Sequence, residues 1–317
     1  MRAPLYPLAL TAALALAACI VSMPHREAAA AAPAALMTWP DLLTRERPKE
    51  SATIAYGEDP LQVADLWLPA GPGPHPTVLM VHGGCWQSDV ADRTIMNWIA
   101  DNLRKRGIAV WNIDYRGVDR AGGGYPGTFR DVAAAADALR THAGRYGLNI
   151  SPLVATGHSA GGHLALWLAA RGPRWKGPLI PAGSPVASRD PIRIDTVVSL
   201  GGLPDLELAA SPPGSGCGTE VIEKLVGPAA QNVRNVFADT SVPRLAPLGS
   251  RQVLINGRQD RIIPADYAFD YQRKMQAAGD EVEVRMLDRT GHVELIAPET
   301  AAWAAAVEEI EKALGRR

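Results

Sequence analysis

The chain has 317 residues, of which 47% are hydrophobic and 21% are charged, and its formal net charge at pH 7 is -1. This length and apolar content predict a large buried core in one α/β domain, or at most two small domains. The near-neutral charge argues against nucleic acid as a partner, because the Lys and Arg residues are scattered rather than clustered.

The N-terminal leader, residues 1–35, has a composition of its own. Its apolar stretch, 8–21, fits a signal-peptide core and is shorter than the roughly 20 residues that span a bilayer. The Ala-rich segment 28–35 then offers small residues for cleavage. Residues 16–19 (Leu-Ala-Ala-Cys) resemble the lipobox of bacterial lipoproteins. We therefore expect export as a cell-envelope lipoprotein anchored to the membrane through Cys19. Cleavage in the Ala-rich segment and release as a soluble secreted or periplasmic protein is the alternative.

Residues 36–317 alternate between strand and helix patterns, which predicts an α/β domain. The run 62–68 alternates polar and apolar residues, as a half-exposed antiparallel strand does. Thr128 is the expected N-cap of its helix. Residues 203–248 break the rhythm, and we expect this insertion to lie over the carboxyl edge of the sheet. Strands are predicted at 52–56, 62–68, 77–81, 108–113, 153–156, 194–200, 251–257 and 281–287, and helices at 92–106, 128–145, 164–170, 265–279 and 298–314.

A glycine pair follows the first fully apolar strand, in residues 82–86 (His-Gly-Gly-Cys-Trp). Adjacent glycines let backbone N–H groups turn toward a bound oxygen without interference from side chains. An oxyanion hole would combine an N–H of Gly83 or Gly84 with that of Ala160. His82 is interpreted as a structural brace for this loop.

A second motif, residues 157–162 (Gly-His-Ser-Ala-Gly-Gly), lies between a predicted strand and a predicted helix. In that context Gly-x-Ser-x-Gly indicates a nucleophile elbow. Side chains at Gly157 and Gly161 would collide with the flanking strand and helix, so both glycines are needed. Ser159 is therefore predicted at the carboxyl edge of the sheet, at the N-terminus of the next helix. In a chain with 30 glycines the pattern can also arise by chance. A catalytic role for Ser159 therefore requires a histidine and an acid elsewhere in the sequence.

Two partner candidates, Asp260 and His292, each follow a later strand, at the same edge as Ser159. The chain order Ser, Asp, His favours a hydrolytic triad. Asp205 and Glu207 in the insertion are alternative acids. The alternative for Asp260 is a carboxylate that only stabilises a turn, and the alternative for His292 is a loop histidine without a catalytic role.

On these motifs the chain resembles the α/β-hydrolases of the HGGxW branch, which holds hormone-sensitive-lipase-type esterases and kynurenine-formamidase-like hydrolases. The resemblance covers roughly residues 50–315 and implies a mostly parallel, doubly wound sheet with helices on both faces. It also implies Ser159 as nucleophile, His292 as base and Asp260 as orienting acid. The residues that carry it are 82–86, 157–162, 257–264 and 291–296.

The implied activity is hydrolysis of small-molecule carboxylic esters with small acyl groups, through an acyl-enzyme on Ser159. An arylformamidase is the alternative, although the expected export argues against it, and a non-catalytic binding module is a third possibility. No metal or organic cofactor is expected, because the histidines lack metal-ligand spacing. Cys85 and Cys217 are compatible with a disulfide or with two free buried thiols. The sequence leaves the oligomeric state open.

Overall fold

The computed structural model describes residues 1, 35–175, 180, 182–228 and 235–316. By its internal contacts the chain divides into two units, Met1–Ala35 and Leu36–Arg317, and the second is described below. The predicted signal segment and its lipidation site at Cys19 lie outside the described residues, so export and anchoring stay predictions. Among the helices of the described residues, none is both long and apolar enough to cross a membrane.

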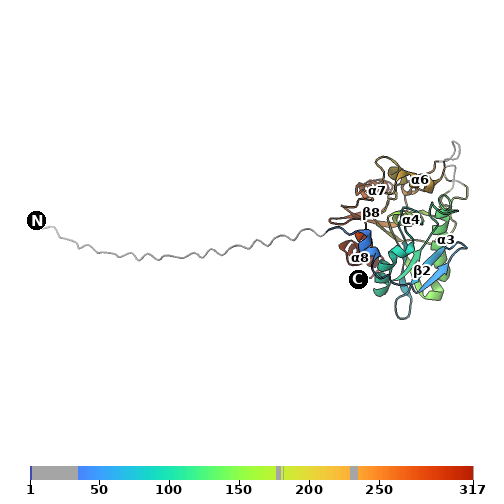
Figure 1. The fold of residues 1–317 in the computed structure, drawn as a ribbon, viewed down its shortest axis with the longest axis horizontal. Helices are drawn as coiled ribbons and strands as arrows, with labels where there is room; N and C mark the ends of the chain where they lie inside the picture. The colour runs from blue at the N-terminus through green and yellow to red at the C-terminus, as the bar shows by residue number, and fades with distance from the viewer. Residues whose placement is uncertain (2–34, 176–179, 181, 229–234, 317) are drawn as a thin grey trace. The chain divides into compact units, whose positions relative to one another are not determined.

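An eight-stranded sheet runs through residues 36–317 (Figure 1). Its strand order is β1-β2-β4-β3-β5-β6-β7-β8; β1 and β4 both pair antiparallel with β2, and every pair from β4 to β8 is parallel. This mostly parallel sheet confirms the predicted α/β-hydrolase fold class. The strands are β1 (Ala52–Ala55), β2 (Val63–Trp67), β3 (His75–Val81), β4 (Ala109–Ile113), β5 (Leu148–His158), β6 (Thr196–Leu200), β7 (Arg251–Gly257) and β8 (Val282–Leu287).

Helices cover both faces of the sheet, as predicted. The segment predicted as one helix at 92–106 is a 3-10 turn, Arg93–Met96, followed by an α-helix. The α-helices are α1 (Trp39–Leu43), α2 (Asn97–Lys105), α3 (Gly127–Tyr146), α4 (Ala160–Ala170), α5 (Leu206–Ala210), α6 (Thr219–Val226), α7 (Asp266–Ala277) and α8 (Ala301–Ala313), with further 3-10 turns at Val242–Leu245 and Glu294–Ile296.

The central strand β3 shows how the core is divided between the two faces. Val78 and Met80 belong to the apolar cluster that includes α2 and α8, whereas Leu79 and Val81 belong to the cluster that includes α3 and α4. Successive side chains of a strand point to opposite faces, so a strand covered on both sides is apolar at every position. The continuous apolar run at 77–81 therefore marks the centre of the sheet.

The prediction of a half-exposed β2 is wrong, because Asp65 and its neighbours Leu66 and Trp67 are all buried. The polar residue in the alternating pattern does not face water. Asp65 forms an ion pair with Arg93 at 2.7 Å and accepts a hydrogen bond from Thr53 at 2.6 Å. A buried carboxylate is tolerated where such partners replace water.

The predicted N-cap role of Thr128 is also wrong, since α3 begins at Gly127 with Pro126 in the cap position. The hydroxyl of Thr128 instead donates to the carbonyl oxygen of Arg116 at 2.6 Å and accepts from the N–H of Gly124 at 3.0 Å. Thr128 therefore fastens the preceding loop rather than the helix end.

The insertion between β6 and β7 contains α5, α6 and a 3-10 turn. These helices were not predicted from the sequence of residues 203–248. Its α6 and the neighbouring α7 are labelled at the top of the domain in Figure 1. A disulfide joins it to the loop after β3, and Gly216 donates an N–H to Ile262 in the loop after β7. Because both loops follow the carboxyl ends of parallel strands, the insertion lies over that edge, as predicted.

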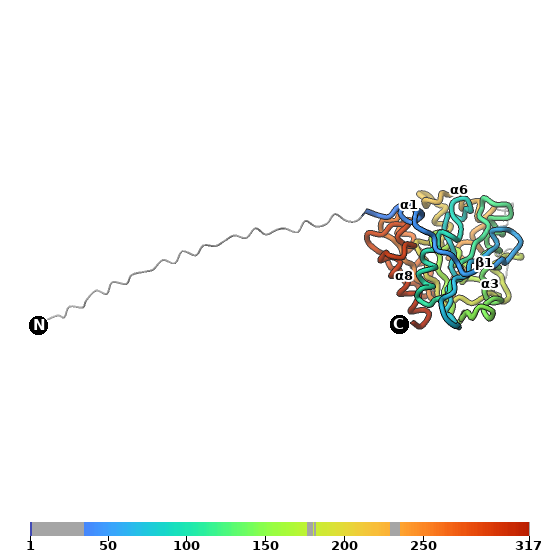
Figure 2. Tube along the Cα trace, turned by 60° about the horizontal axis from the view of Figure 1, so that its bottom comes forward, coloured from blue at the N-terminus to red at the C-terminus, as the bar shows by residue number. Residues whose placement is uncertain are grey.

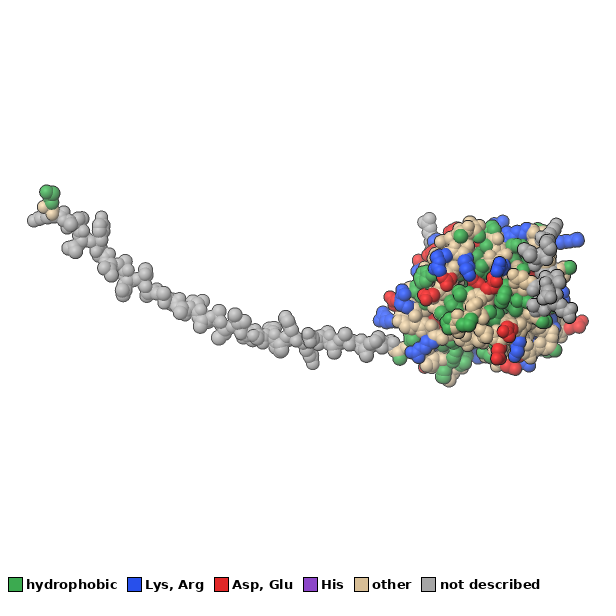
Figure 3. Space-filling model, turned by 90° about the horizontal axis from the view of Figure 1, so that it is seen from above, with side chains coloured by type: hydrophobic (Ala, Val, Ile, Leu, Met, Phe, Trp, Pro, Cys, Tyr) green, Lys and Arg blue, Asp and Glu red, His purple; other side chains and the backbone are tan. Residues whose placement is uncertain are grey.

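The short helix α1 lies beside the C-terminal part of the chain, as the blue and red tubes in Figure 2 show. Arg45 forms an ion pair with Glu299, and the N–H of Met37 donates to Glu294 at 2.5 Å. On the face drawn in Figure 3, acidic and basic side chains are interspersed rather than segregated.

Candidate active site

Ser159 lies at the sharp turn between β5 and α4, with φ 55° and ψ -122°. A positive φ is unfavourable for a serine, and it persists here because the flanking elements fix the backbone. The N–H of Ser159 donates to the carbonyl oxygen of Leu200 at the end of β6, at 2.8 Å. A Cβ atom on Gly157 would collide with the carbonyl of Gly161, and one on Gly161 with the carbonyl of Val81. Both glycines are therefore required by the turn, as the motif predicts.

The predicted oxyanion donors surround this serine. Ala160 is the first residue of α4, where backbone N–H groups have no partner within the helix and the helix dipole is positive. A Cβ atom on Gly83 would lie 3.0 Å from the Cβ of Ser159, so the glycine loop passes directly beside the serine. Gly84 lines the same cavity as Ser159. The structure thus brings together the three backbone positions that the sequence predicted for an oxyanion hole.

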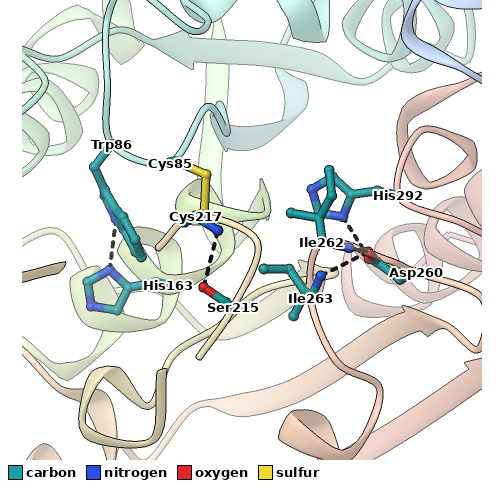
Figure 4. The surroundings of a disulfide bond; sticks show 9 residues. All are labelled: Cys85, Trp86, His163, Ser215, Cys217, Asp260, Ile262, Ile263 and His292. Atoms are coloured by element: carbon teal, nitrogen blue, oxygen red, sulfur yellow. Dashed lines mark hydrogen bonds and ion pairs between the residues drawn. A yellow bond between two sulfur atoms is a disulfide. The ribbon is translucent and has the colours of Figure 1, made fainter. Parts of the chain in front are cut away.

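His292 and Asp260 form a hydrogen-bonded pair, shown on the right of Figure 4. Nδ1 of His292 lies 2.6 Å from Oδ2 of Asp260, and both side chains are buried. The other carboxylate oxygen accepts the N–H groups of Ile262 and Ile263 at 2.8 and 2.9 Å, which fixes the orientation of the carboxylate. With Nδ1–H donating to Asp260, Nε2 of the neutral ring is left as the proton acceptor.

Ser159 and His292 line one cavity of about 360 Å³. Its wall is mostly apolar, with Leu43, Val90 and Ile95 among the contributing side chains. An apolar cavity with a few convergent polar groups is the usual form of a small-molecule site. The predicted nucleophile and base thus meet at one cavity at the carboxyl edge of the sheet.

Two further residues of the site, His158 and Trp39, were not identified from the sequence. Nε2 of His158 donates to the backbone oxygen of His292 at 3.1 Å, and the two rings lie 4.3 Å apart. Burial, and then the charge of His292, lower the pKa of His158 well below its usual range, so this ring stays neutral. Trp39 of α1 meets both histidine rings edge-on, at 6.3 and 6.2 Å between centroids. Only the position of His158 beside the serine hinted at a role.

The interpretation of His82 as a brace is confirmed by its contacts. Its Nδ1 lies 2.6 Å from the carbonyl oxygen of Gly83, and its Nε2 lies 3.0 Å from Oδ1 of Asp114. Its ring stacks on Tyr115 at 4.3 Å, and Arg93 pairs with the other oxygen of Asp114 at 2.9 Å. Burial would raise the pKa of Asp114, but the bonds from His82 and Arg93 hold it below its usual range. Both ring nitrogens of His82 are therefore engaged in holding the loop.

The alternative acids in the insertion are paired elsewhere. Asp205 caps α5 by accepting the N–H of Leu208 at 3.2 Å and forms an ion pair with Lys274. Glu207 forms a bidentate pair with Arg244, with both bonds at 2.7 Å. The structure brings His292 to Asp260 rather than to either of them.

Cys85 and Cys217 form a disulfide, with an S–S distance of 2.01 Å and a Cα–Cα distance of 5.4 Å. This decides between the two states that the sequence left open. The bond joins the glycine loop to the insertion, and Cys85 also lines the cavity of Ser159. Within residues 35–175, 180, 182–228 and 235–316, no group of three His, Cys, Asp or Glu side chains is placed to hold a metal ion.

A serine on a strand–helix elbow, with a His–Asp pair whose histidine lines the same cavity, is the arrangement of the α/β-hydrolase class. The family described as BD-FAE matches residues 64–275, which is more than half of the chain. The chain belongs to this family.

Individual relatives agree with this placement. Esterase LipC of Mycobacterium tuberculosis is 27% identical over 248 residues, which cover 75% of this chain and 58% of the relative. The chain thus matches less than two thirds of that protein's length. Esterase B of Lactobacillus rhamnosis superimposes with a TM-score of 0.68 at 19% identity, covering 85% of this chain and 88% of the other. Esterase 2 of Thermogutta terrifontis, in a form phosphonylated by sarin, gives a TM-score of 0.63 at 17% identity, covering 85% and 95%. At such low identity, the two structures show a shared fold.

Proposed function

We propose that this protein is a serine carboxylesterase that hydrolyses esters of small acyl groups through an acyl-enzyme on Ser159. The observation that carries the proposal is the placement of Ser159 and His292 on one cavity, with Nδ1 of His292 bonded to Asp260 at 2.6 Å. The esterase names of the relatives support the same class of reaction.

The proposed acylation step follows from these positions. Nε2 of His292 takes the proton of the Ser159 hydroxyl as its oxygen attacks the ester carbonyl carbon. Asp260 holds the ring in the required tautomer and stabilises the imidazolium that forms. The N–H groups of Ala160 and of Gly83 or Gly84 bind the developing oxyanion. When the C–O bond breaks, the imidazolium returns the proton to the leaving alcohol.

Deacylation repeats these steps with water as the nucleophile. His292 takes a proton from water, the hydroxide attacks the acyl carbon, and Ser159 leaves with the proton returned by His292. The neutral ring of His158, packed against His292, adds no second positive charge beside the imidazolium. We infer that His158 supports the base by holding its backbone oxygen.

The shape of the cavity supports small acyl groups as substrates. Its volume of about 360 Å³ lies near the lower end of the roughly 300–1,000 Å³ typical of ligand pockets. Ala91, Ile95 and Leu43 line the cavity and would give the acyl chain apolar contacts.

An acyl-length series on the purified protein tests the proposal. We expect nitrophenyl acetate and propionate to be hydrolysed fastest, with rates falling as the acyl chain outgrows the cavity. N-formylkynurenine is the competing substrate, because the same triad could open a formamide. Faster turnover of the formamide than of every ester would overturn the ester assignment in favour of an arylformamidase. Binding without turnover of either substrate would leave a non-catalytic binding module.

We also propose that the protein is exported and anchored through a lipid on Cys19. The Cys85–Cys217 disulfide supports export, because such bonds persist in oxidising compartments and are rare in the cytosol. Mass spectrometry of the mature N-terminus tests the anchor: a lipidated Cys19 is expected, with release into the soluble fraction in Cys19→Ala. A mature chain that starts within residues 28–35 without lipid would contradict it.

A further inference from the structure

The disulfide occupies a place where a small shift would matter for catalysis. Cys85 directly follows Gly83 and Gly84, the proposed oxyanion donors of the loop after β3. Its partner Cys217 is 9% exposed and belongs to the insertion, between α5 and α6. The bond therefore links the oxyanion loop to a segment 132 residues further along the chain.

The connection continues from Cys217 to the loop that carries the acid. The N–H of Gly216 donates to the carbonyl oxygen of Ile262 at 2.7 Å. A Cβ atom on Gly216 would lie 2.9 Å from the Cα of Ile262, so the two backbones are in direct contact. Ile262 in turn donates its N–H to Asp260 at 2.8 Å. Figure 4 shows the disulfide between the Trp86–His163 pair on one side and the Asp260–His292 pair on the other.

The oxyanion loop has a backbone that needs such support. Gly84, Cys85 and Trp86 have φ values of 104°, 51° and 54°, so three consecutive residues lie in the positive-φ region. Two of them are not glycine, and such conformations persist only where the surroundings hold them. The indole N–H of Trp86 donates to Nδ1 of His163 at 3.3 Å, which fixes one end of this stretch. The disulfide fixes its middle residue.

From this geometry we propose that the Cys85–Cys217 disulfide positions the oxyanion loop for catalysis, so that turnover depends on an intact bond. This inference rests on the proposed ester hydrolysis. A dithiol reductant opens the bond by thiol–disulfide exchange: a thiolate attacks one sulfur, and the second thiol of the reductant resolves the mixed disulfide. Two electrons and two protons pass to the protein, which gains two thiols, and the reductant becomes a cyclic disulfide. Cys85 lines the open cavity, which gives a small dithiol a route to the bond.

The test compares the oxidised chain, the same chain after reduction by dithiothreitol, and the double variant Cys85→Ser with Cys217→Ser. We expect kcat for nitrophenyl acetate to fall about 10- to 100-fold on reduction, because a misplacement of about 1 Å costs on that order. KM should change by less than about threefold, since the donors act mainly in the transition state. Affinity for a trifluoromethyl ketone, which forms a tetrahedral adduct with serine, should fall with kcat/KM. The double variant should show the same low kcat and no response to dithiothreitol.

A bond that only stabilises the fold gives a different result. The reduced chain and the double variant would then unfold at lower temperature but keep kcat and ketone affinity within about twofold below that temperature, which would overturn the proposal. If the double variant does not fold, the reduced chain decides by itself: a kcat and a ketone affinity within about twofold of those of the oxidised chain would overturn the proposal. Absence of hydrolysis by the oxidised chain would contradict the proposed function itself.

Discussion

Two histidine–aspartate pairs lie at the carboxyl edge of the sheet, and their surroundings differ. His292 and Asp260 are joined at 2.6 Å, and His292 lines the cavity that also holds Ser159. His82 and Asp114 are joined at 3.0 Å, but the second ring nitrogen of His82 faces the carbonyl of the glycine loop. The histidine of the first pair thus lines the proposed substrate cavity, whereas both ring nitrogens of the second histidine are engaged in internal hydrogen bonds.

The comparison shows that pairing alone does not give a histidine a catalytic role. A general base needs one ring nitrogen within reach of the reacting hydroxyl, with the other held by an orienting group. His292 has its Nδ1 held by Asp260 and lines the same cavity as Ser159, so it is the candidate for this role. His82 holds the glycine loop, which is a positioning role. The predictions below test this division, from the largest expected effect to the smallest.

Removing the two imidazoles should separate the pairs most clearly. We expect His292→Ala to lower kcat for nitrophenyl acetate by about 10⁴- to 10⁶-fold, because Ser159 loses its base. This variant should also unfold at a lower temperature, because it too removes one partner of a buried pair, so kcat is the quantity that separates the two histidines. His82→Ala should lower kcat by no more than about tenfold but lower the free energy of unfolding by about 3 kcal/mol, because it breaks a buried pair. Similar losses of kcat in both variants would contradict the division of roles.

Replacing each carboxylate by its amide sharpens the contrast. Asp260→Asn should lower kcat about 10⁴-fold, since the amide favours the wrong tautomer of His292. Asp114→Asn removes the buried carboxylate that pairs with His82 and leaves Arg93 with Asp65 alone, so it should cost about 3 kcal/mol of stability with a small effect on kcat. Steady-state kinetics and urea unfolding of the two variants measure both quantities. An Asp114→Asn variant that is stable but inactive would assign Asp114 a catalytic role.

A third histidine, His163, makes the stability depend on pH. Burial lowers its pKa from 6.5 to about 4, so between these values the unfolded chain binds a proton that the folded chain does not. Stability should therefore fall as pH drops through this window, and His163 alone should contribute about 2–3 kcal/mol of the loss between pH 7.5 and 4.5. The buried His158 acts in the same direction. Urea unfolding at the two pH values measures the loss.

His163→Gln is the matched control for this pH effect. The amide can still donate to the carbonyl of Thr240 and accept from the indole of Trp86, but it does not titrate. The variant should lose the part of the difference that comes from His163, about 2–3 kcal/mol, and keep the part that comes from His158. An unchanged pH dependence would show that other groups cause it.

The last prediction concerns the glycine loop that His82 holds. A Cβ atom on Gly83 would lie 3.0 Å from Ser159 Cβ and 2.9 Å from the carbonyl oxygen of His158. Gly83→Ala should therefore shift the loop and lower kcat about 100-fold, the lower end of the usual cost of losing an oxyanion donor. Gly144→Ala is the control, because its Cβ would meet open space in α3. A full kcat in Gly83→Ala would remove this loop from the proposed oxyanion hole.

The parts of this site that were predictable from sequence are those encoded locally. The spacing of Gly157 and Gly161 between a strand and a helix identifies the elbow, because the turn itself requires them. Asp260 and His292 were expected near Ser159 because parallel strands bring their carboxyl ends to one edge. Their pairing at 2.6 Å agrees with that logic.

The parts that were missed depend on contacts between distant segments. The bond from His158 reaches a carbonyl 134 residues away, and Trp39 reaches both histidines from α1. The alternation of polar and apolar residues at 62–68 led to the wrong prediction that β2 is half-exposed, because Asp65 is buried against Arg93 rather than exposed to water. The pairing of Cys85 with Cys217 likewise depends on where the insertion lies, which composition and periodicity do not encode.

Covalent labelling with a nitrophenyl phosphonate tests the central claim most directly. The reagent traps a serine that is activated by its neighbours, and peptide mapping by mass spectrometry locates the adduct. We predict one adduct, on the peptide that contains Ser159, in step with the loss of ester turnover. Ser159→Ala should lack both the adduct and the turnover, and His292→Ala should react far more slowly. Ester hydrolysis that survives in Ser159→Ala, or an adduct on another residue that accounts for the lost turnover, would contradict the assignment of Ser159 as the nucleophile.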